Sequence, residues 1–126
     1  MILDDDPLIT SLLVTVFQRR GYDVITYCDP TVCPIFSTTD CLCPKGKKCF
    51  NVIMSDYEVP FVNGVVFFEV LRKKGCRCAN IALMSGSSIP EEVIMRASKL
   101  GVKFIAKPFH RNQITDWLDQ IEQHNG

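Results

Sequence analysis

Residues 51–56 read NVIMSD, a mainly apolar run that stops at one aspartate. A strand inside a parallel sheet is covered on both faces, so it shows a continuous apolar run instead of alternating apolar and polar residues. The stretch therefore predicts a buried strand from Asn51 to Ser55, with Asp56 at its carboxyl end.

Strands and helices are expected to alternate on both sides of this run. Short apolar runs predict four more strands, at 1–3, 24–27, 81–84 and 102–106. Apolar residues at helical spacing predict helices at about 7–20, 63–74, 89–100 and 114–121. Ser88 and Glu91 have the spacing of a capping box at the start of the third of these helices. The alternation predicts an α/β fold with a doubly wound parallel sheet.

Length and charge narrow the class of protein. The chain has 126 residues, the size of one ordinary domain, and its formal net charge is zero. A balanced charge argues against nucleic acid or an anionic membrane as a partner. No apolar run approaches the roughly 18 residues of a spanning helix, and an acidic start at Asp4 is the opposite of a signal peptide. We expect the protein in the cytoplasm.

Polar side chains gather where the predicted strands end. Asp4 and Asp5 follow the first strand, and Asp56 follows the third. Ser85 follows the fourth strand and Lys107 the fifth. Because ligands of such sheets bind beyond the carboxyl ends of the strands, these side chains are expected to share one site.

The expected cluster indicates phosphoryl chemistry. Three converging carboxylates repel one another, and a divalent cation relieves that repulsion. Magnesium prefers oxygen ligands and is commonly held by carboxylates together with phosphate oxygens. A neighbouring lysine and hydroxyl would complete a pocket for a dianionic group, and one carboxylate can act as the nucleophile.

Four stretches at these strand ends carry a family resemblance. They are ILDDDP at 2–7, VIMSDYEVPFVNG at 52–64, ALMSGS at 82–87 and FIAKPF at 104–109. Together they resemble the receiver domain of bacterial two-component response regulators, in the same order and over nearly the whole chain. The resemblance implies a flavodoxin-like fold, whose five parallel strands have the order 2-1-3-4-5, and one receiver domain over 1–126.

The resemblance also implies the roles of the acidic residues. Asp56 would accept a phosphoryl group from a histidine kinase or a phosphotransfer protein. Asp4 and Asp5 would hold Mg²⁺ together with Asp56, and the backbone carbonyl of Glu58 would add a ligand. The peptide bond of Lys107–Pro108 is expected to be cis, an isomer that is essentially confined to proline.

Further residues would contact the phosphoryl group or respond to it. By the resemblance, Ser85 would bond a phosphoryl oxygen and Lys107 would pair with it. The backbone amides of Tyr57 and Gly86 would donate to the same group. Phe104 would occupy the aromatic switch position, which moves inward when the serine is drawn to the phosphate.

The same resemblance implies a surface that changes on phosphorylation. This surface is the face built from the fourth helix, the fifth strand and the fifth helix. An attached output domain, or a second copy in a homodimer, would contact it.

A cysteine-rich stretch interrupts the pattern between the second and third strands. Residues 28–50 show no sustained period and are expected to be an irregular insertion in place of a regular second helix. Four of the seven cysteines lie between residues 33 and 49 of this stretch, and two more precede the fourth strand: Cys33, Cys41, Cys43, Cys49, Cys76 and Cys78. Zinc, an iron–sulfur cluster, a disulfide and reduced thiols all remain open for these residues.

Two other functions are alternatives to a phosphorylated receiver. One is a metal or redox sensor on a receiver scaffold, which would act through the cysteine cluster. The other is a phosphohydrolase of the haloacid dehalogenase type, which needs an Asp-x-Asp-x-Thr pattern. Here Leu8 stands at the threonine position of that pattern, which disfavours the phosphohydrolase.

Overall fold

The computed structural model describes residues 1–29, 50–59, 62–86 and 88–125, and the side chains up to residue 123. Five parallel strands form one sheet in the order β2-β1-β3-β4-β5, as predicted. The strands are β1 (Ile2–Leu3), β2 (Thr26–Tyr27), β3 (Val52–Asp56), β4 (Asn80–Ser85) and β5 (Lys103–Ala106). The helices are α1 (Pro7–Arg19), α3 (Gly64–Lys73), α4 (Glu91–Lys99) and α5 (Arg111–Asn125).

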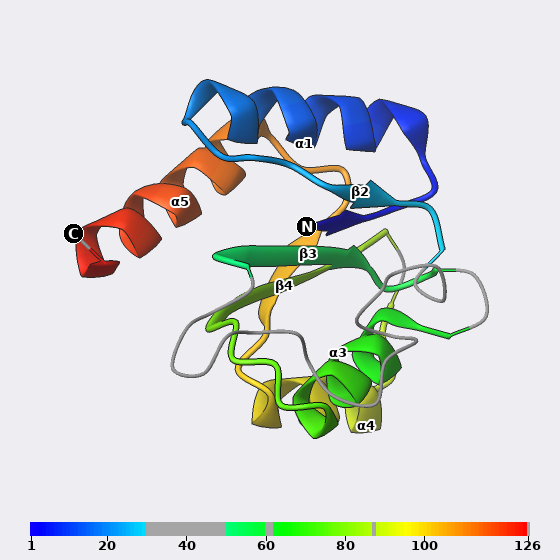
Figure 1. Ribbon diagram of the computed structural model, residues 1–126. Helices are drawn as coiled ribbons and strands as arrows, with labels where there is room; N and C mark the ends of the chain where they lie inside the picture. The colour runs from blue at the N-terminus through cyan, green and yellow to red at the C-terminus, as the bar shows by residue number, and fades with distance from the viewer. Residues whose placement is uncertain (30–49, 60–61, 87, 126) are drawn as a thin grey trace.

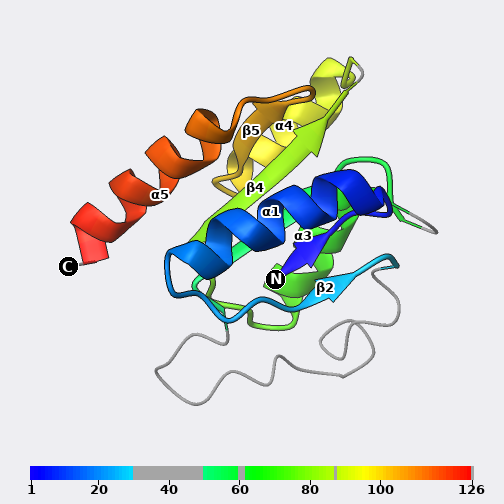
Figure 2. The same cartoon turned by 90° about the horizontal axis from the view of Figure 1, so that it is seen from above.

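The helices cover both faces of the sheet. α1 and α5 lie on one face and α3 and α4 on the other (Figure 1). Figure 2 shows β2 and β5 at opposite edges of the sheet. Each face buries its own apolar cluster, one including Phe67 and Leu83 and the other including Phe17 and Trp117. This doubly wound arrangement leaves the two ends of the strands as the places where polar side chains can meet.

The central strand differs from its prediction by one residue at each end. All five residues of β3 are buried, which explains its continuous apolar sequence. Asn51 lies outside the strand, whereas Asp56 lies inside it because it pairs with Met84 of β4. The carboxylate of Asp56 is therefore held by the regular backbone of the sheet.

Two helices begin with a side-chain cap and one does not. Asp6 caps α1 by accepting a hydrogen bond from the amide of Leu8. Asn63 caps α3 by accepting from the amide of Val66 at 2.9 Å. The predicted capping box at the start of α4 is wrong, because Pro90 is the N-cap residue and no side chain caps that helix.

The start of α4 has a simple physical explanation. A capping box places its glutamate at the third helical position, but Glu91 is the first residue of α4. Glu91 and Glu92 both lie in the first turn, where the helix dipole favours negative charge.

Within the described residues, no helix has the length and apolar character needed to cross a membrane.

Candidate functional site

The ends of β1 and β3 bring three carboxylates together. Asp4, Asp5 and Asp56 each place one carboxylate oxygen within 4.8 Å of the others. Asp4 and Asp56 are 3% and 9% exposed, whereas Asp5 is open to solvent. The structure therefore confirms that these three acids meet at one edge of the sheet.

Lys107 faces this acidic cluster from the end of β5. Its ammonium nitrogen lies 2.7 Å from Oδ2 of Asp4 and 3.4 Å from Oδ1 of Asp56. The Lys107–Pro108 peptide bond is cis, as predicted. Among the described residues, one cation therefore stands against three carboxylates, which leaves a surplus of negative charge.

The pKa values of Asp56 and Lys107 reflect this arrangement. Burial raises the pKa of Asp56, and the charge of Asp4 raises it further, while the ammonium of Lys107 opposes both effects. Burial alone would lower the pKa of Lys107, but its hydrogen bond to Asp4 and the two carboxylate charges outweigh burial and raise it. An additional hard cation fits this set of oxygen donors, because it would favour the ionised form of Asp56.

Local hydrogen bonds orient Asp4. The amide of Asp6 donates to Oδ1 of Asp4 at 2.9 Å, and Lys107 occupies the other carboxylate oxygen. The hydroxyl of Thr10 in α1 donates to the backbone carbonyl of Asp4 at 3.3 Å. The turn between β1 and α1 therefore supports the acid as well as starting the helix.

The connection from β3 to α3 is closed by backbone contacts. The carboxylate of Asp56 accepts a hydrogen bond from the backbone of Glu58. Glu58 forms an antiparallel bridge with Asn63, and the amide of Gly64 donates to the carbonyl of Tyr57 at 2.9 Å. A shallow, open pocket lies against this connection and includes Asp5 and Asp56 in its lining.

The two backbone amides that were predicted to bind phosphate, those of Tyr57 and Gly86, lie in different surroundings. The amide of Tyr57 donates to the carbonyl of Met84 at 2.7 Å, so in this structure it is engaged by the sheet. Gly86 is exposed directly after β4. The backbone amide of Glu58, which the sequence prediction did not include, is the one that contacts Asp56.

Ser85 and Phe104 lie on the two strands next to the acidic cluster. Ser85 is half-buried at the end of β4, and its carbonyl accepts a hydrogen bond from the amide of Lys107 at 2.8 Å. Phe104 in β5 is 38% exposed, so its aromatic side chain reaches the surface. Ser85 is the last residue of its strand, whereas Phe104 is the second residue of β5.

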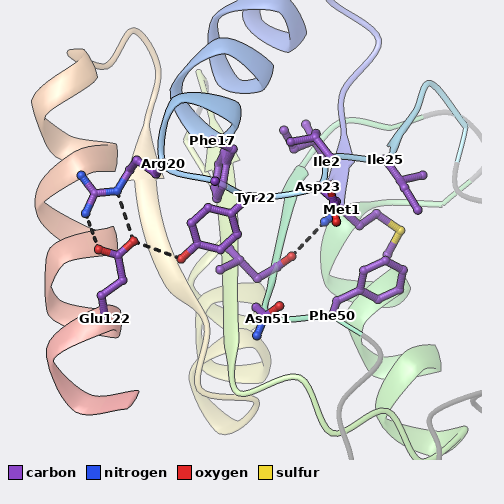
Figure 3. Close-up of a pocket in the computed structure, with 13 residues that line it drawn as sticks. Met1, Ile2, Phe17, Arg20, Tyr22, Asp23, Ile25, Phe50, Asn51 and Glu122 are labelled. Carbon is purple, nitrogen blue, oxygen red and sulfur yellow. Dashed lines mark hydrogen bonds and ion pairs between the residues drawn. The ribbon is translucent and has the colours of Figure 1, made fainter. Parts of the chain in front are cut away.

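A second hollow of about 570 Å³ lies at the opposite end of the strands. Figure 3 shows Arg20 and Tyr22 converging on Glu122 of α5. Arg20 also pairs with Asp119 at 2.5 Å, so its charge is fully compensated. The sequence did not predict this cluster, because its partners are about one hundred positions apart in the chain.

The structure describes only two of the six cysteines that were considered for a metal or disulfide site. Cys33, Cys41, Cys43 and Cys49 lie outside the described residues. Cys76 and Cys78 are buried in the apolar cluster under α3, where burial raises the pKa of Cys78.

Four supporting residues were not predicted from the sequence. Ser55 lies in an apolar run and reads as part of the strand, and Thr10 reads as a polar position of an amphipathic helix. Asn63 and Gly64 form a recognisable pair, because asparagine favours the N-cap of a helix and glycine permits close packing. That pair was the one available signal for the contacts behind Asp56.

Comparison with known proteins agrees with this geometry. The chain is 25% identical over 121 residues to the transcriptional activator protein PfeR of Pseudomonas aeruginosa. The match covers 96% of this chain but only 36% of PfeR, so the chain spans about a third of that relative.

Solved structures share the fold. The non-phosphorylated receiver domain of HemR from Leptospira biflexa matches with a TM-score of 0.75 at 21% identity, over 95% of this chain and 90% of that one. The chemotaxis protein CheY4 of Vibrio cholerae matches with a TM-score of 0.69 at 21% identity, over 95% and 94%. Residues 1–119 match the response regulator receiver domain, and the chain therefore belongs to this family of two-component signalling domains.

Proposed function

We propose that Asp56 is the phosphoacceptor of this receiver domain and takes its phosphoryl group from the phosphohistidine of a kinase or phosphotransfer protein. Receiver domains act as phosphoacceptor switches in two-component signalling. One observation carries the assignment: Asp56 ends a buried central strand, 3.4 Å from the ammonium of Lys107 and beside two more carboxylates. A buried acid with a single nearby cation and access to an open pocket suits attack on an anionic group.

Receiver domains bind Mg²⁺ at an acidic pocket, and the carboxylates described above form such a pocket here. We assign its ligands to Asp4, Asp5 and Asp56, with the backbone carbonyl of Glu58 as a fourth protein oxygen. When bound, Mg²⁺ would neutralise negative charge on the pocket and on the phosphoryl oxygens. The cluster is suited to that role because Lys107 alone leaves two carboxylate charges uncompensated.

The transfer itself requires few protein groups. One carboxylate oxygen of Asp56 attacks phosphorus, a P–O bond forms, and the P–N bond of phosphohistidine breaks with its electron pair leaving on nitrogen. Lys107 is close enough to Asp56 to pair with the arriving phosphoryl group. The hydroxyl of Ser85, the last residue of β4, and the amide of Gly86, directly after it, are on the same edge and would donate to the remaining phosphoryl oxygens. We expect the chain to catalyse only its own phosphorylation and dephosphorylation.

The switch surface is proposed on α4, β5 and α5. Three of its apolar side chains are exposed: Ile94 by 39%, Met95 by 59% and Phe104 by 38%. Inward movement of Phe104 when Ser85 bonds the phosphoryl group would alter this apolar surface. An output domain or a second copy of the chain is the partner that we propose for it.

Direct phosphorylation tests the proposal. Incubation with acetyl phosphate and Mg²⁺ should add one phosphoryl group to the wild type, detected by intact-protein mass spectrometry. Asp56→Asn should take up none, and chelation of Mg²⁺ should prevent uptake by the wild type. Asp23→Asn, which changes an exposed acid beside the opposite hollow, is the matched control and should behave as the wild type. Failure of the wild type to take up phosphate, or uptake by Asp56→Asn, would show the assignment to be wrong.

The domain boundary and the cellular setting remain proposals. We propose one receiver domain over residues 1–126, acting in the cytoplasm with a histidine kinase. Among the described residues nothing favours the alternative sensor function, because Cys76 and Cys78 are packed in the apolar core. The predicted insertion at 28–50, with its zinc or iron–sulfur alternatives, falls almost wholly outside the described residues.

A further inference from the structure

Ser55 is a polar residue in the most apolar part of the sheet. It is 0% exposed and stands directly before Asp56 in β3. Its hydroxyl donates to the backbone carbonyl of Asp56 at 2.9 Å. A buried hydroxyl costs free energy unless it is hydrogen-bonded, so this contact accounts for how serine is tolerated here.

The acceptor of this hydrogen bond lies where regular sheet pairing stops. The pairing of β1 with β3 ends at Leu3 and Ser55, one residue before Asp56. The carbonyl of Asp56 thus lies beyond the last paired residue on the β1 side. The hydroxyl of Ser55 supplies a partner at that point.

α3 packs closely against the same carbonyl. A methyl group added at Gly64 would stand 2.7 Å from the carbonyl oxygen of Asp56 and 3.2 Å from the hydroxyl of Ser55. The first separation is shorter than real Cβ contacts and the second is tighter than most of them, so little room is left between the helix and Asp56 for any side chain larger than that of glycine. Ser55 and Gly64 together form what we call the carbonyl lock.

Backbone hydrogen bonds also hold the two residues after Asp56. The amide of Tyr57 donates to Met84 at 2.7 Å, and the carbonyl of Tyr57 accepts from the amide of Gly64 at 2.9 Å. Glu58 is bridged to Asn63. The backbone that carries the Asp56 carboxylate and the Glu58 carbonyl therefore has little freedom to rotate.

We infer that Ser55 is a positioning residue for phosphoryl transfer, acting through the carbonyl lock to aim the Asp56 carboxylate and the Glu58 backbone at the acidic pocket. This inference rests on the proposed role of Asp56. Groups that orient metal ligands or nucleophiles from behind commonly affect affinity and rate by about 10-fold to 100-fold. Ser55 touches neither the phosphoryl group nor the cation, so its effect must pass through the backbone.

Ser55→Ala tests the inference with one atom removed. We expect its Mg²⁺ dissociation constant, measured by calorimetry without a phosphodonor, to rise about 10-fold. We expect its phosphorylation rate with acetyl phosphate at saturating Mg²⁺ to fall by a similar factor. Gly64→Ala, whose methyl group would crowd the same carbonyl, is an independent variant with the same expected direction.

Two controls separate positioning from stability. Ile53→Val removes a methylene from a 0% exposed residue of the same strand and lowers stability without touching the Asp56 carbonyl. Ser55→Thr keeps the hydroxyl while adding a methyl group, and it should bind Mg²⁺ more tightly than Ser55→Ala. All variants are compared at a temperature where their circular-dichroism spectra match the wild type.

The outcomes are distinguishable. A wild type that takes up no phosphoryl group would overturn the proposed function itself. If the wild type is phosphorylated but Ser55→Ala matches Ile53→Val in both Mg²⁺ affinity and rate, the positioning role is wrong. An equal loss in Ser55→Thr and Ser55→Ala would also overturn it, because the hydroxyl would then be irrelevant.

Discussion

The two ends of the sheet both gather charges around a hollow, but they compensate those charges differently. At the amino end, Arg20 meets Asp119 and Glu122, whose side chains are 54% and 43% exposed. At the carboxyl end, the side chains of Asp4 and Asp56 are 0% and 12% exposed, and Lys107 is their shared cation. Water can solvate the first cluster, whereas the second depends on cations. The charge left uncompensated is therefore what distinguishes the two hollows.

Removal of Lys107 should give the largest effect at the carboxyl end. Lys107→Met keeps the length of the side chain but deletes the charge that faces Asp4 and Asp56. Loss of one preorganised group that stabilises developing charge commonly slows a reaction by about 10²-fold to 10³-fold. We expect a loss of that size in the rate of phosphorylation by acetyl phosphate, followed by mass spectrometry. An unchanged rate would remove Lys107 from the mechanism.

Addition of a methyl group at Gly64, next to the backbone of Asp56, should have the next largest effect, here on stability. The methyl group of Gly64→Ala would stand 2.5 Å from Cδ1 of Leu83 as well as against the carbonyl of Asp56. Overpacking of this kind costs about 1–3 kcal/mol. Urea denaturation should show that loss, whereas Gly86→Ala, whose nearest neighbour is Cβ of Lys107 at 3.7 Å, should be nearly neutral. Equal stability of the two variants would contradict the close approach of α3.

The pH dependence of stability tests the burial of Asp56. Its pKa in the folded protein is raised, chiefly by burial, above the ordinary value of 3.8. Between those two pKa values the folded state binds more protons than the unfolded state, so stability falls as pH rises through that window. In Mg²⁺-free buffer, Asp56→Asn should therefore gain stability relative to wild type as pH rises, and the difference should level off above the folded pKa.

Urea denaturation of both proteins across the acidic pH range measures this difference. Addition of Mg²⁺ at neutral pH should stabilise the wild type more than Asp56→Asn, because the variant lacks one proposed ligand. A stability difference that does not vary with pH would mean that Asp56 is better solvated than its 9% exposure indicates.

The strand ends were predictable from sequence because periodicity and topology suffice to place them. An apolar run that stops at Asp56 marks a buried parallel strand, and parallel strands end at one edge. Asp4 and Lys107 could be assigned to the same edge by that argument alone. The cis peptide after Lys107 and the strand order followed from the family resemblance.

The supporting contacts were not predictable because they depend on packing between distant elements. The hydroxyl of Ser55 could have turned toward several acceptors, and its choice depends on how α3 presses against β3. The failed capping box at Ser88 shows the same limit, since Pro90 shifted the start of α4 and moved Glu91 to the first position. Local patterns identify which groups matter, and tertiary packing decides which atoms they contact.

Removal of the Arg20 side chain, at the amino end of the strands, should give the smallest effect on stability. Arg20→Met removes the hydrogen bonds to Asp119 and Glu122 that link α1 to α5. Because the partners are exposed, the loss of unfolding free energy should be below about 1 kcal/mol. High salt should shrink the difference from wild type further, because salt screens exposed charges. The phosphorylation rate should stay at the wild-type value, since the cluster lies at the opposite end of the strands. A slower rate in Arg20→Met would instead mean that the two ends are coupled through α1, whose first turn carries Thr10 against the carbonyl of Asp4.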